Sequence, residues 1–160
     1  MKFMGSLIAV TDLDKSRTFY RDILGLTVTT DHGPSVTFNG CVVLHTMDSW
    51  VDMIKSKYVM FDNRASEMYF ETEDFDGLTA RLGAFGIEYV HRPILLPWGQ
   101  RVVRFYDPDR HIIEVGEAIA TVMRRFAAEG MNAEQIAERM KLNVNFVRKC
   151  LEEKGDNNAV

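Results

Sequence analysis

The sequence predicts an α+β fold in which a strand–helix–three-strand (βαβββ) unit occurs twice, forms a curved mixed sheet and is followed by a helical extension. The first supporting observation is an internal repeat, because the motif DLD at 12–14 returns as DFD at 74–76. In both copies the motif stands between a short apolar run and a helically spaced apolar stripe. The second observation is that GL at 25–26 returns as GI at 86–87, before further strand-like segments. A unit this small cannot bury its sheet alone, so the two copies must pack together.

The first unit is predicted over residues 1–46. Its helix begins after Asp12, whose carboxylate can accept hydrogen bonds from the free N–H groups of the first turn. The helix ends before Gly25, a residue suited to the left-handed conformation that often closes a helix. Asn39-Gly40 is a strong hairpin signal between the last two strands. The expected elements are a helix over 13–24 and strands over 7–10, 26–30, 35–38 and 41–46.

The second unit is predicted over residues 66–116, after a linker over 47–65 whose WVDMI segment can form a short helix. Apolar residues recur at helical spacing from Phe75 to Phe85 and form one stripe. The sequence DPD at 107–109 is expected to make the last turn. The expected elements are a helix over 75–85 and strands over 68–72, 88–90, 101–106 and 111–115.

A helical extension is predicted over 117–155, followed by a disordered tail over 156–160. Asn132 and Gln135 have the spacing of a capping box. The three-helix pattern resembles a helix-turn-helix, a motif that binds DNA. Residues 117–160 nevertheless hold seven Lys/Arg and seven Asp/Glu, whereas phosphate binding needs a basic excess. We therefore expect these helices to pack against the sheet units or a second subunit, and we expect no nucleic-acid partner.

The composition, 46% hydrophobic and 26% charged, is that of an ordinary globular protein. A net charge of −4 gives no electrostatic attraction to nucleic acid or to an anionic membrane. There is no apolar run of membrane-spanning length, and the amino terminus lacks the pattern of a signal peptide. Cys41 and Cys150 are far apart and lack a metal-binding spacing, so we expect two free thiols in a reducing cytoplasm.

Two segments resemble the signatures of one superfamily. Its opening signature is similar to residues 10–26, VTDLDKSRTFYRDILGL. Its closing signature is similar to residues 105–117, FYDPDRHIIEVGE. This is the vicinal oxygen chelate superfamily, which includes glyoxalase I, bleomycin-resistance proteins and extradiol dioxygenases. This resemblance, over about residues 3–116, implies that each unit forms a half-barrel and that the pair encloses a cup for a small molecule. It also implies a homodimer, and it leaves open whether the cup forms within one chain or across two. The reaction stays open too, because this fold carries lyases, isomerases, dioxygenases and plain binding proteins.

In metal-dependent members of that superfamily, four strand positions hold one divalent ion in the cup. The resemblance assigns these positions to Gly5, Leu44, Glu67 and Glu114, so two of the four carry a ligand side chain. Such a pair could hold Mg²⁺, Mn²⁺, Ni²⁺, Zn²⁺ or iron, with water or substrate at the vacant positions. His45 follows Leu44 directly, but strand alternation sends the two to opposite faces. As a metal ligand, His45 would need a bulge or a shifted register.

Glu67 and Glu114 allow two further interpretations. As catalytic residues without a metal, two carboxylates in a partly dry pocket would favour protonation of one of them, giving a general acid or base beside a substrate carbonyl. Alternatively, one or both could form an ion pair with Arg101 or Arg104 as part of the pocket wall. These three interpretations, a metal site, an acid/base pair and structural pairing, remain open on the sequence.

Six residues are predicted to contact the ligand. Trp98, in a Pro-Trp-Gly turn at a strand mouth, could stack on a planar ligand or close the core at the barrel end. Gln100 and Arg101 beside it could bind a carboxylate or a carbonyl. Strand alternation adds side chains on the inward face that Glu67 and Glu114 share. The predicted ligand contacts are Trp98, Gln100, Arg101, Arg104, Tyr69 and Glu71. The other histidines, expected at solvated surface positions, are His32, His91 and His111.

Two functions follow from this pattern. The first is a binding protein of the bleomycin-resistance kind, which holds an aromatic or amphiphilic small molecule in a metal-free cup, and the empty metal positions favour it. The second is a lyase or isomerase acting on a small carbonyl or thioester compound, and the retained pair Glu67 and Glu114 favours it. Glyoxalase I proper is disfavoured, because two of its four metal positions are empty. In both cases the second unit brings the reactive groups and the first shapes the space before them.

Overall fold

The computed structural model describes residues 1–152 and has the predicted α+β architecture of two four-stranded mixed sheets with helices. The predicted tail at 156–160 and the last part of the predicted extension, 153–155, lie outside the described residues. The first unit contains β1 (Ser6–Val10), α1 (Leu13–Asp22), β2 (Val28–Asp31), β3 (Ser35–Phe38) and β4 (Val42–Thr46). Its strand order is β1-β4-β3-β2, with β1 and β4 parallel. We call this the first sheet.

The second unit repeats this plan after the linker helix α2 (Met47–Ile54), which the sequence also predicts. It contains β5 (Glu67–Thr72), α3 (Phe75–Ala84), β6 (Tyr89–Leu95), β7 (Arg101–Tyr106) and β8 (Ile112–Glu117). The strand order of this second sheet is β5-β8-β7-β6, with β5 and β8 parallel. β6 extends well beyond the predicted 88–90. Pro93, which has no N–H to donate, is accommodated because β6 is an edge strand whose register shifts between His91 and Ile94.

The repeated motifs do the same structural work in both units. The Asp12 carboxylate accepts a hydrogen bond from Lys15 N at 3.0 Å and caps α1, and Asp74 caps α3 in the same way. Gly25 and Gly86 follow these helices with φ values of 69° and 63°, a left-handed conformation that favours glycine. The local signals of the repeat therefore predict where both helices begin and end.

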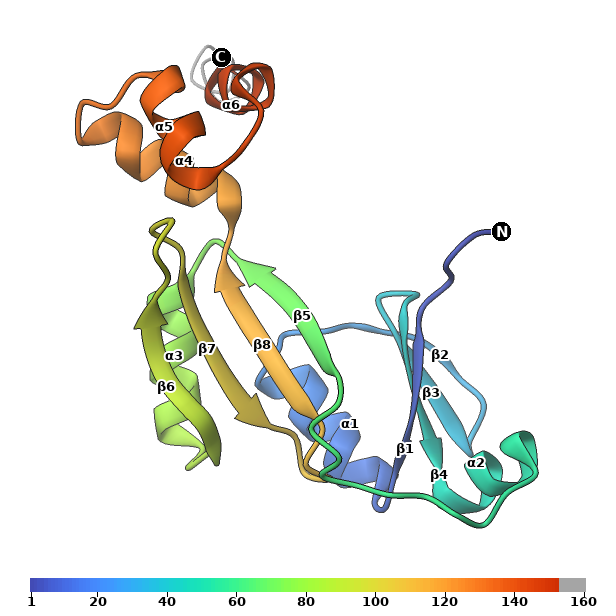
Figure 1. Cartoon of the computed structure of the whole chain (residues 1–160). Coiled ribbons are helices and arrows are strands. Elements are labelled where there is room, and N and C mark those ends of the chain that lie inside the picture. The colour runs from blue at the N-terminus through green and yellow to red at the C-terminus, as the bar shows by residue number, and fades with distance from the viewer. Residues whose placement is uncertain (153–160) are drawn as a thin grey trace, which may run out of the picture.

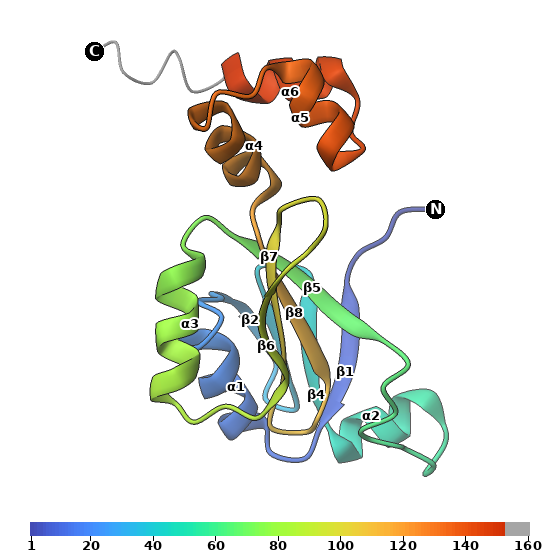
Figure 2. The same ribbon diagram turned by 60° about the vertical axis from the view of Figure 1, so that its left-hand side comes forward.

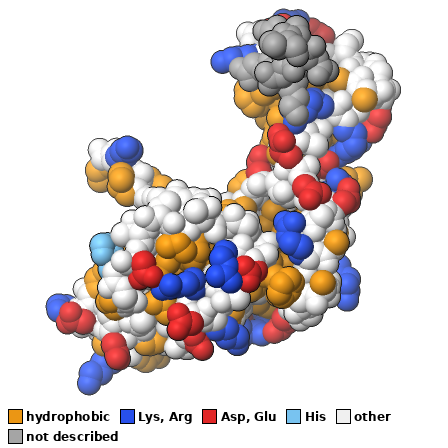
Figure 3. Space-filling model, turned by 180° about the vertical axis from the view of Figure 1, so that it is seen from behind, with side chains coloured by type: hydrophobic (Ala, Val, Ile, Leu, Met, Phe, Trp, Pro, Cys, Tyr) orange, Lys and Arg blue, Asp and Glu red, His pale blue; other side chains and the backbone are white. Residues whose placement is uncertain are grey.

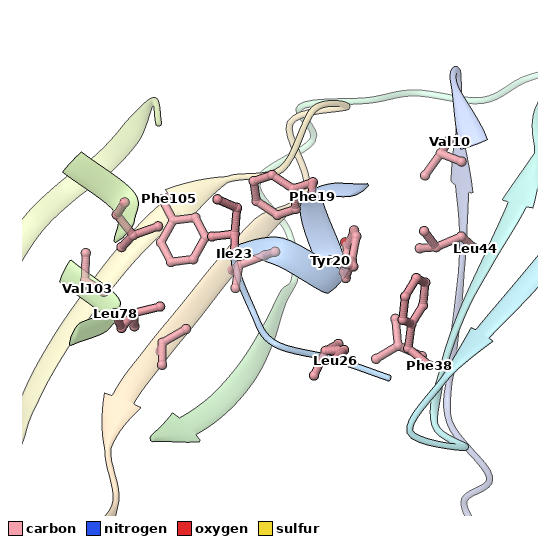
Figure 4. Packing of buried hydrophobic residues seen from close by; sticks show 14 of the residues in the cluster. Val10, Phe19, Tyr20, Ile23, Leu26, Phe38, Leu44, Leu78, Val103 and Phe105 are labelled. Atoms are coloured by element: carbon pink, nitrogen blue, oxygen red, sulfur yellow. The ribbon is translucent and has the colours of Figure 1, made fainter. Parts of the chain in front are cut away.

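Helix α1 lies between the two sheets and packs against both (Figures 1 and 4). Phe19 and Ile23 point toward the second sheet, where the rings of Phe19 and Phe105 lie 6.3 Å apart. Tyr20 points toward the first sheet, and its ring centre lies 5.8 Å from that of Phe38. We call the sheet faces that pack on the helices the inner faces. The space between the inner faces is thus filled by one hydrophobic core.

The predicted turn at 107–109 joins the second unit to the start of α1. Asp109 is buried and accepts hydrogen bonds from Thr11 N at 3.0 Å, from the Thr11 hydroxyl and from Ser16 Oγ at 3.4 Å. Asp107 accepts one from the buried Tyr20 hydroxyl at 3.0 Å. The prediction that His111 is a solvated surface residue is wrong. Its Nε2 contacts the carbonyl oxygen of Ala9 at 2.9 Å. These contacts between the units satisfy carboxylates that would otherwise be buried without partners.

Three helices, α4 (Ile119–Ala128), α5 (Ala133–Met140) and α6 (Val144–Glu152), form the C-terminal part of the described chain. They project beyond the end of the second sheet (Figures 1 and 2) and have a hydrophobic cluster of their own. The capping box of Asn132 and Gln135 is present at the start of α5, as predicted. Seen from behind, these helices and the N-terminal arm rise on opposite sides of a hollow (Figure 3). Within residues 1–152, no helix combines the length and the apolar character needed to cross a membrane.

The junction at Asp109 gives a prediction about stability. Replacing Asp109 with Asn removes a charged acceptor from the buried Ser16 on α1 and from Thr11 just before the helix. We expect Asp109→Asn to lower the free energy of unfolding by about 1–3 kcal/mol, measured by urea denaturation. Asp52→Asn, which changes an exposed carboxylate on α2, is the matched control and should change it by less than about 0.5 kcal/mol. Equal effects of the two substitutions would contradict the structural role of Asp109.

Candidate ligand-binding site

The outer face of the second sheet, turned away from the helices, gathers most of the predicted site residues. Tyr69 pairs with Glu114 across β5 and β8, and Glu114 pairs with Arg104 across β8 and β7. Residues that pair in this way point to the same side of a sheet, and every second residue along a strand joins them. Glu67 and Glu71 therefore share this face, as the sequence predicts. The outer face thus carries Glu67, Tyr69, Glu71, Arg104 and Glu114.

Arg104 stands at the centre of this face. Its Nε donates to Glu67 Oε2 at 2.8 Å, and its Nη2 donates to Glu67 Oε1 at 3.3 Å and forms an ion pair with Glu114 Oε2. Its Nη1 lies 3.1 Å from His91 Nε2, so His91 belongs to the site and is not the solvated residue expected. The Glu114 side chain is only 8% exposed and that of Glu67 is 36% exposed. Of the interpretations left open for the two glutamates, the ion pair with Arg104 is the one that the structure contains.

Arg101 lies on the inner face, away from Glu67 and Glu114, so its predicted place beside them is wrong. Its guanidinium bonds to Glu117 and Asp76 and lies 4.9 Å from the centre of the Phe75 ring. The physical reason is strand alternation, since Arg101 and Arg104 are three residues apart on β7 and must point to opposite faces.

The predicted rim residues are linked into one hydrogen-bond chain. Trp98 Nε1 donates to Gln100 Oε1 at 3.1 Å, and Gln100 Nε2 donates to Tyr69 Oη and to the Glu117 carbonyl, both at 2.9 Å. The Tyr69 hydroxyl donates to Glu71 Oε1 at 2.8 Å. Gln100 is buried and its amide is engaged, so it positions Tyr69 and Trp98 and does not itself face a ligand. Trp98 and Tyr69 stay accessible, with 38% and 50% exposure.

Glu117, which the sequence reasoning missed, anchors the helical extension. Its buried carboxylate accepts hydrogen bonds from Arg101 and, at 3.0 Å, from Arg125 Nη2 on α4. Burial alone would raise the pKa of Glu117, but the hydrogen bonds from Arg101 and Arg125 outweigh it and leave the pKa below its usual value. A signal was present in the sequence. If Glu114 points outward, alternation sends Glu117 to the inner face, where a charge needs a partner.

The first sheet shows that the position assigned to Leu44 was wrong. Leu44 is on the inner face with 0% exposure and belongs to the core around α1. Leu7, the counterpart of Tyr69, pairs with Val43, so Val43 is the true counterpart of Glu114. His45 points away from Leu44, as predicted, and therefore lies on the outer face in a regular register, so no bulge is needed to place it there.

His45 is held by the linker helix α2. Its Nδ1 lies 3.1 Å from Ser49 Oγ, and its ring centre lies 6.0 Å from that of Trp50. Burial lowers the pKa of His45, so the imidazole is neutral at physiological pH. In the second unit the helix that follows the last strand is α4, and its first residue, Ile119, donates its N–H to Glu71 Oε2 at 3.2 Å.

A cleft of about 380 Å³ separates the edge strands β1 and β5. Both units line it, with Gly5 and Leu7 on one side and Glu67 and Ile112 on the other. Glu67 is therefore the residue at which the outer face of the second sheet reaches the space between the units. Glu114 does not line this cleft.

The donor set does not fit a bound divalent metal. The two candidate carboxylates are both engaged by the Arg104 guanidinium, a positive charge that an incoming cation would have to approach. Across residues 1–152, no group of three or more His, Cys, Asp or Glu side chains is arranged to hold a metal ion. His45 does not complete such a group, since it lies on the first sheet beside Ser49 and Trp50.

Two βαβββ units with helices on their inner faces are the architecture of the vicinal oxygen chelate class. The family model of the glyoxalase-like domain matches residues 3–120, and the chain belongs to this family. The solved structure of a protein of unknown function from Agrobacterium tumefaciens is 37% identical over 74% of this chain and 95% of that one, with a TM-score of 0.68. A search of curated proteins gave no match.

Two further solved structures carry functional names. A lactoylglutathione lyase from Agrobacterium tumefaciens is 25% identical over 73% of this chain and 93% of that one, with a TM-score of 0.54. A glyoxalase/bleomycin resistance protein/dioxygenase from Nocardioides is 22% identical over 73% of this chain and 83% of that one, with a TM-score of 0.59, and it supports the fold alone. The similarity in each case stops short of the full chain.

The Glu117 junction gives a prediction about pH. Because the pKa of Glu117 is lowered by folding, its carboxylate stabilises the protein above the unfolded-state pKa, and this stabilisation is lost as the pH falls through the folded-state value. We expect Glu117→Gln to lower the free energy of unfolding by about 1–3 kcal/mol at neutral pH and by less in acid, measured by urea denaturation in steps down to about pH 3. Glu73→Gln, at an exposed carboxylate, is the control and should show no such trend. A loss that stays constant with pH would contradict the role given to Glu117.

Proposed function

We propose that this protein binds a small organic molecule in a metal-free cup formed by two copies of the chain, and that its ligand joins an aromatic or other apolar body to a basic group. The observation that carries the proposal is the Arg104 cluster, which we define as Arg104, Glu67, Glu114 and His91. It supplies charge and hydrogen bonds to an exposed sheet face without a metal ion.

The charge of the outer face favours a cationic ligand. Three carboxylates, those of Glu67, Glu71 and Glu114, share this face with the Arg104 guanidinium, which leaves a formal charge of −2 (three negative, one positive) for these four side chains. Of the two carboxylates in the Arg104 cluster, that of Glu67 is the more exposed to solvent, and Glu67 borders the cleft between the units. A basic group on a ligand would meet complementary charge on the outer face, which favours both capture and orientation. The cleft itself is balanced in charge, because its lining includes Arg64 and Arg110 as well as Asp62 and Glu67.

The same face offers apolar and aromatic surface for the rest of the ligand. Tyr69 and Trp98 are exposed and are held in place through Gln100. Ile94, which pairs with Val102 of β7, is exposed on β6. Rigid aromatic side chains of this kind bind planar ligands with little loss of conformational freedom, and they also attract cations. This combination of rings with a few placed polar groups is typical of small-molecule sites.

The cup is proposed to need a second copy because α1 occupies the space between the sheets of one chain. Both inner faces pack against this helix, so the two outer faces point away from it in different directions. Each outer face keeps exposed apolar residues, Leu7 on the first sheet and Tyr69 on the second. The first sheet of one copy facing the second sheet of another would cover both and enclose a cup, as in dimeric proteins of this superfamily.

The dimer is open to a direct test. We expect sedimentation velocity to give a species of twice the chain mass of 18.3 kDa. Leu7→Glu, on the outer face of the first sheet, should produce folded monomers, because it places a charge in the proposed interface. Phe85→Glu is the matched control, since Phe85 is at least as exposed but lies at the end of α3 on the helical side. A wild-type monomer, or the same result for both variants, would contradict the shared cup.

The ligand class can be tested with two dyes of opposite charge. We expect the cationic dye proflavine to quench tryptophan fluorescence at lower concentration than the anionic dye fluorescein. Glu67→Gln should weaken proflavine binding about tenfold and leave fluorescein binding unchanged, because it removes the exposed charge at the cleft. Glu73→Gln, outside the outer face, is the control. Equal binding of the dyes, or no effect of Glu67→Gln, would contradict the proposal.

The alternative function, a lyase or isomerase of small carbonyl or thioester compounds, makes a different forecast. It requires turnover of such a compound by the wild-type chain and loss of turnover in Glu67→Gln, in which the carboxylate can no longer accept a proton. Turnover that Glu67→Gln abolishes would replace the binding function with this one.

A further inference from the structure

We infer that Tyr69 makes the site select ligands that donate a hydrogen bond, because a directional hydrogen-bond chain leaves its hydroxyl able only to accept one from a ligand. The ligand lies on the outer face of the second sheet, so this selection rests on the proposed function for the place of the ligand. It does not depend on the charge of the ligand. It adds the class of polar group, an N–H or O–H beside the aromatic or apolar body.

The direction of the chain is fixed at its start by the indole of Trp98. An indole N–H can only donate, so the atom of Gln100 that lies 3.1 Å from it must be the amide oxygen. The amide nitrogen of Gln100 then points the other way, where it also lies 2.9 Å from the Glu117 carbonyl oxygen, which can only accept. Two neighbours of opposite character therefore determine how this amide is oriented, since the reverse orientation would break both bonds.

The Tyr69 hydroxyl continues the chain from Gln100 to Glu71. Gln100 Nε2 lies 2.9 Å from Tyr69 Oη and donates to it. The single hydrogen of the hydroxyl is donated to Glu71 Oε1 at 2.8 Å, because a carboxylate can only accept. Burial of the hydroxyl raises the pKa of Tyr69, so the hydroxyl keeps this hydrogen at physiological pH.

The far end of the chain is held by the helical extension. The first residue of α4, Ile119, donates its N–H to Glu71 Oε2 at 3.2 Å. The N-cap residue of α4 is Ala118, which has no side-chain oxygen, so Glu71 supplies an acceptor to the helix from β5. Both oxygens of Glu71 thus have donors, and the N-terminus of the helix favours the charged carboxylate that accepts from Tyr69.

Gly116 of β8 provides the room in which Gln100 and Tyr69 meet. It lies opposite Glu71 across β5 and β8. A Cβ atom at this position would lie 2.6 Å from Gln100 Nε2 and 3.1 Å from Tyr69 Oη. A side chain at residue 116 would therefore push the amide away from the hydroxyl, and the absence of one lets the chain close across three strands.

One acceptor position on the Tyr69 hydroxyl remains for a ligand. A phenol hydroxyl has one hydrogen and two lone pairs, and the chain uses the hydrogen and one lone pair. Because Tyr69 is 50% exposed on the outer face, a ligand beside it meets the remaining lone pair. An N–H or O–H completes this hydroxyl, whereas a carbonyl or ether oxygen would lose its hydrogen bonds to water and gain none. The chain thus favours the basic group of the proposed ligand over the carbonyl substrate of a lyase or isomerase.

The experiment uses three neutral bicyclic compounds of similar size: indole donates a hydrogen bond, 1-indanone accepts one, and benzofuran lacks a donor. Binding to the full chain labelled with the nitrogen isotope of spin one-half is followed by NMR, through the side-chain N–H signals of Trp98 and Gln100. We expect wild type to bind indole about tenfold more tightly than the other two compounds. Tyr69→Phe should remove this preference by weakening indole binding alone. Tyr58→Phe, at an exposed tyrosine of the linker, is the matched control and should bind as wild type does.

Glu71→Gln should reverse the preference. The Ile119 N–H still needs an acceptor, so the new amide turns its oxygen to α4 and its NH2 group to Tyr69. The hydroxyl then receives two donors and points its own hydrogen toward the ligand. We expect this variant to bind 1-indanone more tightly than wild type does and to bind indole about tenfold more weakly. A purely structural role of Glu71 would weaken all three compounds alike.

Three results would overturn the inference while the proposed function stands, since the charged dyes test that function separately. They are equal binding of indole and benzofuran by wild type, an unchanged preference for indole in Tyr69→Phe, and an unchanged preference in Glu71→Gln. If none of the three compounds shifts the signals of Trp98 and Gln100, the inference and the aromatic site of the proposed function fail together.

Discussion

The packing of both sheets against one helix is the constraint on which the rest of the structure depends. Tyr20 and Phe19 are neighbours on α1, yet they enter the cores of opposite sheets. The hydroxyl of Tyr20 is buried with them, so it needs an acceptor, and Asp107 from the second unit supplies one. Burial raises the pKa of Asp107, which shows the electrostatic cost of placing that carboxylate there. With the inner faces committed to α1, only the outer faces are left for a ligand.

The pairing of β7 with β8 then divides two functions between the faces of one sheet. Arg104 faces Glu114 on the outer face, and three residues away Arg101 meets Glu117 on the inner face. Both glutamates are buried, so each arginine neutralises a charge that could not stand alone. The outer pair belongs to the candidate site, whereas the inner pair anchors α4 through Arg125. The helical extension and the site are thus attached to the same two strands.

The bounds of the helices and the face of the second sheet that carries the site could be predicted from local sequence patterns. The errors in the site come from strand pairing between residues far apart in the sequence. The caps at Asp12 and Asp74 and the shared face of Glu67 and Glu114 follow from short patterns that any strand or helix must obey. The assignment of Leu44 failed because it matched apolar triplets in β4 and β8. The true match depends on how β1 pairs with β4, which neighbouring residues do not determine. His91 was missed because the strand that carries it was predicted to end at residue 90, whereas β6 continues to Leu95 and pairs His91 with Arg104.

The corrected register changes what a shared cup would contain. The sequence suggested that the first unit only shapes the space, because Gly5 and Leu44 offer no reactive group. With Val43 as the counterpart of Glu114, the outer face of the first sheet carries His45, set against Trp50 of α2. Its lowered pKa makes it a neutral donor and acceptor that would face the Arg104 cluster of another copy. The two repeats have therefore diverged in charge, one keeping carboxylates around a guanidinium and the other an uncharged imidazole beside an indole. A cup built from both could recognise a ligand with one cationic end and one aromatic end.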